Sequence, residues 1–172
     1  MIRATKVLPA GEWDPKAEID VIKLTHDSRY RRRVTMRAAG DTVFLLDLPE
    51  AGRMKDGDGL RLDDGRMIRV VAAAEPLLEI TGDAHLLSRL AWHLGNRHVP
   101  AEIRTQALRI TPNHVLEAML KKLGAHVAPI EAPFYPEAGA YAHDHTYSHD
   151  HNHDHGHQHD PRTHRHKHGH GH

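Results

Sequence analysis

The chain has 172 residues, in which 23 lysines and arginines balance 23 aspartates and glutamates. This balance leaves no strong basic field, so the composition argues against a nucleic-acid-binding or membrane-surface protein. Cysteine is absent, which excludes a disulfide framework, a thiolate zinc site and a cysteine nucleophile. The N-terminus is charged and lacks the apolar core of a signal peptide, and no stretch approaches the roughly 20 apolar residues that span a membrane. We therefore expect a cytoplasmic protein.

Residues 1–74 are predicted to form a small all-β domain. Turn residues separate short β-like runs: IRATKVL, AEIDVIKL, RRRVTMRA, TVFLLDL, GLRL and RMIRVVAAA. The clearest hairpin signal is Asp63-Asp64-Gly65, which lies between LRL and RMIRV. The basic stretch RYRRR (29–33) offers a surface for a peptide or an acidic partner, although a solvated strand face explains it more simply.

Residues 75–141 are predicted to form a ferredoxin-like domain of order βαββαβ, which makes the chain an α+β protein. The run PLLEIT (76–81) is expected to be extended, and 82–95 to be a helix that ends at Gly95. The apolar residues of this helix recur at helical spacing: Leu86, Leu87, Leu90, Ala91 and Leu94. Two strands are expected between residues 101 and 110.

The second helix of this domain has Thr111 as its expected N-cap and Pro112 as its first residue. Its apolar stripe is expected to contain Val115, Leu116, Met119, Leu120 and Leu123. Gly124 is expected to end the helix, and 125–131 to form the last strand. This order of elements buries two helices on one face of an antiparallel sheet.

Residues 142–172 form a polar, histidine-rich tail that we expect to be disordered without metal, since it contains almost no apolar surface to bury. Thirteen of its histidines lie between His143 and His172, at an irregular spacing that no expression tag has. Imidazole binds nickel, copper and zinc, and a flexible tail does not select among them, so zinc and copper are expected to bind as well. The predicted tail ligands are His143, His145, His149, His151, His153, His155, His157 and His159.

The rest of the chain holds six histidines. A single histidine in a domain is usually a surface or structural residue, which is the simplest interpretation of His26, His85 and His126. His98 differs because it lies in GNRHVP, between the end of a helix and a strand. One histidine does not hold a transition metal tightly, but a two-fold dimer could pair His98 with its own copy near the axis. His114 is a possible additional ligand.

Three motifs make the chain recognisable: HLGNRHVPAEI (93–103), NHVLEAMLKKLGAHV (113–127) and PFYPEAGAY (133–141). Together with the histidine-rich tail, they resemble the UreE family of urease accessory metallochaperones. The resemblance implies a homodimer whose C-terminal domain forms the interface, where His98 meets its dimer mate to hold Ni(II). Many members have a HisXHis pair before the second helix. Only His114 remains of it here, so His143 and His145 are alternative ligands.

The family role implied by this resemblance is to bind nickel in the cytoplasm and pass it, with the accessory GTPase and its partner proteins, to apo-urease. A nickel or zinc storage protein without a dedicated recipient would explain the tail equally well. An enzyme that uses Asp63 and Asp64 is the third possibility. The sequence contains no catalytic-triad spacing, phosphate-binding glycine loop or HisGluXXHis motif, so we expect no enzymatic activity.

Overall fold

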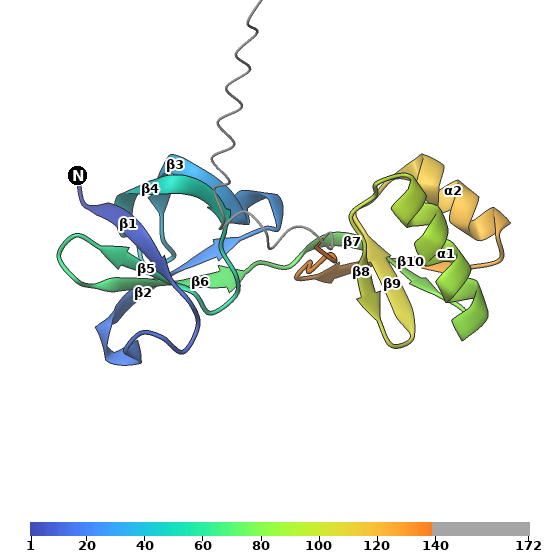
Figure 1. Cartoon of the computed structure of the whole chain (residues 1–172), viewed down its shortest axis with the longest axis horizontal. Coiled ribbons are helices and arrows are strands. Elements are labelled where there is room, and N and C mark those ends of the chain that lie inside the picture. Colours follow the sequence, from blue (N-terminus) through green and yellow to red (C-terminus); the bar gives the residue numbers. More distant parts are fainter. Residues whose placement is uncertain (139–172) are drawn as a thin grey trace, which may run out of the picture. The chain divides into compact units, whose positions relative to one another are not determined.

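The computed structural model describes residues 1–138 (Figure 1). The histidine-rich tail, with its eight predicted ligands and its predicted disorder, lies outside the described residues. Within the described part, no helix is both long enough and apolar enough to cross a membrane.

The N-terminal part is a six-stranded sheet (Figure 1). Its strands are β1 (Arg3–Leu8), β2 (Glu18–Leu24), β3 (Tyr30–Arg37), β4 (Val43–Arg53), β5 (Gly59–Leu62) and β6 (Met67–Ala72). They lie in the order β2-β6-β5-β1-β4-β3, with β1–β4 and β2–β6 parallel and the other pairs antiparallel. Two short 3-10 helices, η1 (Pro15–Ala17) and η2 (Asp27–Arg29), precede β2 and β3.

Alternation of side chains explains how this sheet forms its core. In β4, Phe44, Leu46 and Leu48 are buried because successive side chains of a strand point to opposite faces. The predicted hairpin joins β5 to β6: the Leu62 amide donates to the Arg66 carbonyl at 2.9 Å. All six predicted strand runs therefore form strands.

The C-terminal part is a four-stranded antiparallel sheet with two helices. Its elements in chain order are β7 (Glu75–Thr81), α1 (Ala84–Asn96), β8 (Glu102–Arg104), β9 (Ala107–Ile110), α2 (His114–Lys122) and β10 (His126–Ala132). The strands lie in the order β10-β7-β9-β8, which is the sheet of a ferredoxin-like fold. The predicted α+β fold class is confirmed.

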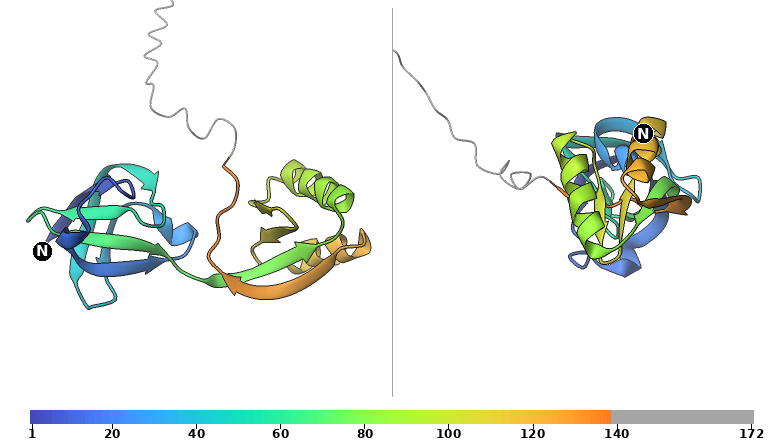
Figure 2. Two further views of the ribbon diagram at one scale, coloured as in Figure 1. Left: turned by 90° about the horizontal axis from the view of Figure 1, so that it is seen from below. Right: turned by 90° about the vertical axis from the view of Figure 1, so that its right-hand side faces the viewer.

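Both helices pack against the sheet with their apolar stripes (Figure 1, Figure 2). Helix α1 buries Leu87, Leu90 and Leu94, and α2 buries Leu120. These side chains form one core with apolar residues of the strands: Leu78, Ile80, Leu108, Ile110 and Val127. The faces of the helices that pack here follow from their 3.6-residue period.

The predicted end of the first helix and the predicted start of the second helix were wrong. Helix α1 continues through Gly95 to Asn96, so Gly95 does not end it. Helix α2 begins at His114, and its N-cap is Asn113 rather than Thr111. The Asn113 side-chain oxygen accepts hydrogen bonds from two backbone amides of the first turn at 3.0 Å, and this satisfies donors that a helix start otherwise leaves unpaired.

Two predicted surfaces also differ from the structure. Val115, expected in the apolar stripe of α2, is 63% exposed. Arg29, expected on the basic surface of RYRRR, is 3% exposed and lies in η2 rather than in the strand. The exposed basic surface is therefore limited to residues 31–33, which lie on the edge strand β3.

The packing of α1 yields a stability prediction. Leu90→Ala should lower the free energy of unfolding by about 2 to 5 kcal/mol, because the substitution removes a fully buried side chain and leaves a cavity. Ser88→Ala on the exposed face of the same helix is the control and should change it by less than about 0.5 kcal/mol. Urea denaturation measures both values. Equal effects would contradict the packing of α1 described above.

Candidate metal centre

His98 is the residue after the C-cap of α1, in the turn that ends the helix. The His98 amide donates to the Gly95 carbonyl at 3.0 Å, and the Val99 amide donates to the Leu94 carbonyl at 3.1 Å. This pair of bonds is the Schellman motif, which requires a left-handed residue after the C-cap. His98 is that residue, with φ of 54°.

Helix α2 ends with the same motif, and there the left-handed residue is a glycine. The Gly124 amide donates to the Lys121 carbonyl at 3.0 Å, and the Ala125 amide donates to the Leu120 carbonyl at 3.1 Å. Gly124 has φ of 99°. Glycine adopts this conformation without a steric penalty, so the end of α2 is the unstrained counterpart of the end of α1.

The conformation of His98 carries a cost that its surroundings do not explain. A left-handed non-glycine residue costs about 1 to 2 kcal/mol, and Asp41 is the other such residue in the described chain. Asp41 lies in a tight turn, in which the Ala38 amide donates to the Thr42 carbonyl and the Asp41 amide donates to the Ala38 carbonyl, and aspartate is common in such turns. His98 is exposed, so its imidazole does not contribute to the core. Strain at an exposed side chain is typical of a functional position.

The helix ends also differ in their electrostatic suitability for a cation. His98 follows the C-terminus of α1, where the helix dipole and the free carbonyl groups favour positive charge. His114 is the first residue of α2, where the dipole disfavours it. Of the two predicted ligands in the described residues, His98 is therefore in the better place to bind a metal ion.

The other histidines of the described chain lie beside η2, on α1 and in β10. His26 is half-buried beside η2, and burial lowers the pKa of its imidazole, with Arg53 adding to the shift. His85 and His93 lie on α1, and His126 begins β10. Within residues 1–138, no group of three or more histidines and carboxylates gathers at distances suitable for a metal ion. Among these residues, His98 and His114 therefore belong to no complete set of metal ligands.

The exposed side of α1 carries one large apolar side chain, that of Trp92. Trp92 is 65% exposed, and the edge of its ring meets the His93 ring with centroids 5.1 Å apart. Trp92 and His93 line a shallow hollow of about 360 Å³, together with His85, Ser88 and Arg89.

Sequence reasoning selected His98 but missed its conformation. Gly95 was the expected helix end because glycine usually takes the left-handed position. The available signal was the pair Leu94 and Val99, whose apolar contact commonly accompanies a Schellman motif. That spacing places the left-handed residue at 98.

The left-handed residues after α1 and α2 generate a prediction about stability. His98→Gly should raise the free energy of unfolding by about 1 kcal/mol, because glycine relieves the left-handed strain. The matched change Gly124→Ala should lower it by about 1 kcal/mol. Urea denaturation of the metal-free proteins measures both. A destabilised His98→Gly variant would show that the imidazole supports the fold.

Comparisons with known proteins identify the family. A family model described as UreE urease accessory protein, N-terminal domain, matches residues 4–73, and the C-terminal domain model of the same family matches residues 75–172. A urease accessory protein UreE from Bradyrhizobium sp. (strain ORS 278) is 57% identical over 143 residues, which cover 83% of this chain and 68% of that protein. Its counterpart from Beijerinckia indica subsp. indica is 51% identical over 143 residues, covering 83% and 82%.

These matches confirm the resemblance found in the sequence and imply a role in urease maturation. The family consists of accessory metallochaperones and not of enzymes, so the prediction of a non-enzymatic protein is also confirmed. With 51% to 57% identity over most of the chain and both of its domains matched, this chain belongs to the UreE urease accessory protein family.

Proposed function

We propose that this protein is a cytoplasmic homodimer that binds Ni(II) between the two copies of His98 and delivers it to apo-urease, together with the accessory GTPase and its associated maturation proteins. The observation that carries the proposal is the left-handed His98 at the end of α1. The chain keeps a strained, exposed imidazole where α2 has an unstrained glycine. A ligand role explains this difference.

The incomplete set of ligands supports a dimer. The described residues of one chain bring no third ligand to His98. A two-fold axis beside His98 would supply a second imidazole from the partner without any additional residue, because a symmetric interface pairs a residue near its axis with its own copy. Nickel also has a strong affinity for imidazole.

The exposed apolar side chains of the helices support an interface on the same domain. Trp92 on α1 and Val115 on α2 are 65% and 63% exposed. Scattered apolar residues are normal on a protein surface, but a tryptophan beside a shallow hollow is typical of interface cores. Burial of Trp92 against a second copy would provide the apolar contact that a stable dimer needs.

Chain length supports a contribution from the first tail histidines. The Glu137 amide donates to the Ala101 carbonyl at 2.9 Å. Residue 137 is therefore held beside Ala101, which follows His98 by three positions in the sequence. Six further residues lead to His143, and six extended residues span up to about 20 Å. His143 and His145 therefore have the reach to act as additional ligands, as His114 also could from the start of α2.

Transfer requires that the ion can leave as well as bind. Imidazole ligands from two subunits and from the tail can be exchanged one at a time, so the ion need not be released into water before a recipient takes it. The tail adds capacity, whereas the His98 pair sets the tightest affinity. Zinc and copper bind imidazole as well and are expected to compete.

The first test is nickel titration calorimetry with light scattering. The full chain and the 1–142 truncation should each bind one tight nickel ion per dimer, with lower total capacity after truncation. His98→Ala should weaken the tight site by at least about 100-fold, since loss of a direct ligand costs more than loss of a second-shell group. His126→Ala at the exposed start of β10 is the control and should leave that site unchanged. Tight binding that disappears with the tail alone would favour a storage protein.

The second test addresses delivery. Deletion of the gene should abolish urease activation at low nickel concentration, and excess nickel should restore it, because the protein supplies an ion and catalyses no step. Complementation with the His98→Gly variant should fail at low nickel, although this variant is expected to be the more stable protein. Normal urease activation in the deletion strain would contradict a delivery role.

A further inference from the structure

The pairing of β7 with β10 brings the end of the folded chain back to its middle. The two strands are antiparallel over seven residue pairs, from His126–Thr81 to Ala132–Glu75. Glu75 follows the N-terminal sheet closely, and its carboxylate accepts a hydrogen bond from the His26 amide at 2.7 Å. The residues that follow Ala132 therefore arrive beside η2 of the N-terminal part.

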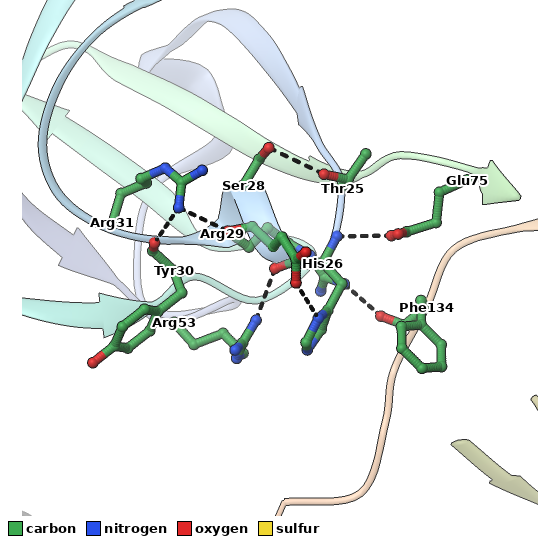
Figure 3. A network of polar contacts seen from close by, with 10 residues as sticks. Thr25, His26, Ser28, Arg29, Tyr30, Arg31, Arg53, Glu75 and Phe134 are labelled. Atoms are coloured by element: carbon green, nitrogen blue, oxygen red, sulfur yellow. Dashed lines mark hydrogen bonds and ion pairs between the residues drawn. The ribbon is translucent and has the colours of Figure 1, made fainter. Parts of the chain in front are cut away.

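Arg29 of η2 holds this returning segment (Figure 3). The Arg29 Nη2 donates to the Phe134 carbonyl at 2.5 Å, across 105 positions in the sequence. The guanidinium also lies over the Tyr135 ring, 5.2 Å from its centroid. Phe134 is 1% exposed, and the edge of its ring meets the His26 ring with centroids 5.3 Å apart.

Glu102 at the start of β8 holds the same segment from the C-terminal part. The Tyr135 amide donates to Glu102 Oε2 at 3.1 Å, and Arg104 donates to Oε1 at 2.8 Å. Glu102 is 5% exposed, so these bonds form in a largely dry environment. Two residues later, the Glu137 amide donates to the Ala101 carbonyl. Residues 134–137 are thus bonded both to η2 of the N-terminal part and to residues 101 and 102 of the C-terminal part.

The cost of this arrangement argues for a specific role. Arg29 is a buried cation, and its Nε has no hydrogen-bond partner in the described structure. Burial lowers the pKa of the Arg29 guanidinium, and the nearby Glu75 and Asp56 carboxylates oppose this shift. A buried charge is weak evidence for stability, since an apolar residue often serves as well. Arg29 is better explained by the position of the segment that it binds.

We infer that Arg29 and Glu102 form a clasp that fixes residues 133–137, so that the histidine-rich tail starts from one defined place on the folded chain. Arg29 is a positioning residue in this arrangement and touches no metal. The clasp itself is independent of metal binding, whereas its consequence, that the first tail histidines can add ligands to His98, rests on the proposed function. A partner that binds η2 or β3 would act on the start of the tail through Arg29.

Hydrogen exchange followed by mass spectrometry tests the clasp in the metal-free full chain. Arg29→Met should speed exchange of the Tyr135 and Glu137 amides, which donate hydrogen bonds to Glu102 and Ala101, by at least tenfold, with exchange in the two sheets unchanged. Arg32→Met, an exposed arginine on β3, is the control and should have no effect. Arg29→Lys should fall between the two, because it keeps the charge and loses the planar fork. Unchanged exchange in Arg29→Met would overturn the inference.

A second variant covers the case in which Arg29→Met disturbs the N-terminal sheet. Tyr135→Leu removes the ring below the guanidinium at a position that is 45% exposed. It should speed exchange of the same amides about threefold, within the range of a single cation–π contact. No change in this variant, with wild-type exchange in the sheets, would also count against the clasp.

Distance measurement gives an independent readout. The chain has no cysteine, so Arg61→Cys on β5 and Ala138→Cys after the clasp allow spin labels at two chosen sites. Labelled chains are diluted with an excess of unlabelled chain, so that distances within one chain dominate. Pulsed electron paramagnetic resonance should then give one narrow distance distribution, which becomes broad with Arg29→Met and stays narrow with Arg32→Met. A broad distribution before any further substitution would overturn the inference. Loss of the nickel site in His98→Ala would leave this distribution unchanged, so the two proposals fail separately.

Discussion

Strand β7 is the element on which the arrangement of the candidate site depends. It pairs with β9 on one side and with β10 on the other, so it occupies the interior of the four-stranded sheet. Its length fixes where α1 begins, and α1 then carries the chain to His98. Its pairing with β10 returns the chain to η2 and to the residues beside β8. The His98 loop and the start of the tail are thereby held by one sheet.

The end of α1 shows how a fold can retain a strained histidine at the expense of stability. Two helices of one domain end in the same hydrogen-bonded turn, and the residue in the left-handed position is glycine in α2 and histidine in α1. Natural proteins stay above a stability threshold rather than at an optimum. A strained exposed histidine at a helix C-terminus can therefore persist where its imidazole is needed, and the helix dipole favours a cation at the same place.

The strands and the apolar faces of the helices could be predicted because they follow the simple periods of 2 and 3.6 residues. The end of α1 and the start of α2 could not be predicted, because Gly95 and Thr111 fit the usual preferences while His98 and Asn113 take those positions in the structure. The end of α2 at Gly124 was predicted correctly. Selection of His98 as a ligand depended on the resemblance carried by GNRHVP. The burial of Arg29 was beyond local reasoning, since RYRRR has the pattern of an exposed strand and the contact partner Phe134 is 105 positions away.

If one nickel ion is shared by two copies of His98, chains and ions must be found in one particle at a ratio of two to one. Native mass spectrometry of the 1–142 truncation, mixed with one nickel ion per two chains, measures this ratio. We expect a dominant species of two chains with one nickel ion, and an ion-free dimer for His98→Gly at the same concentrations. Nickel bound to single chains, or retained by the His98→Gly dimer, would contradict a shared ion.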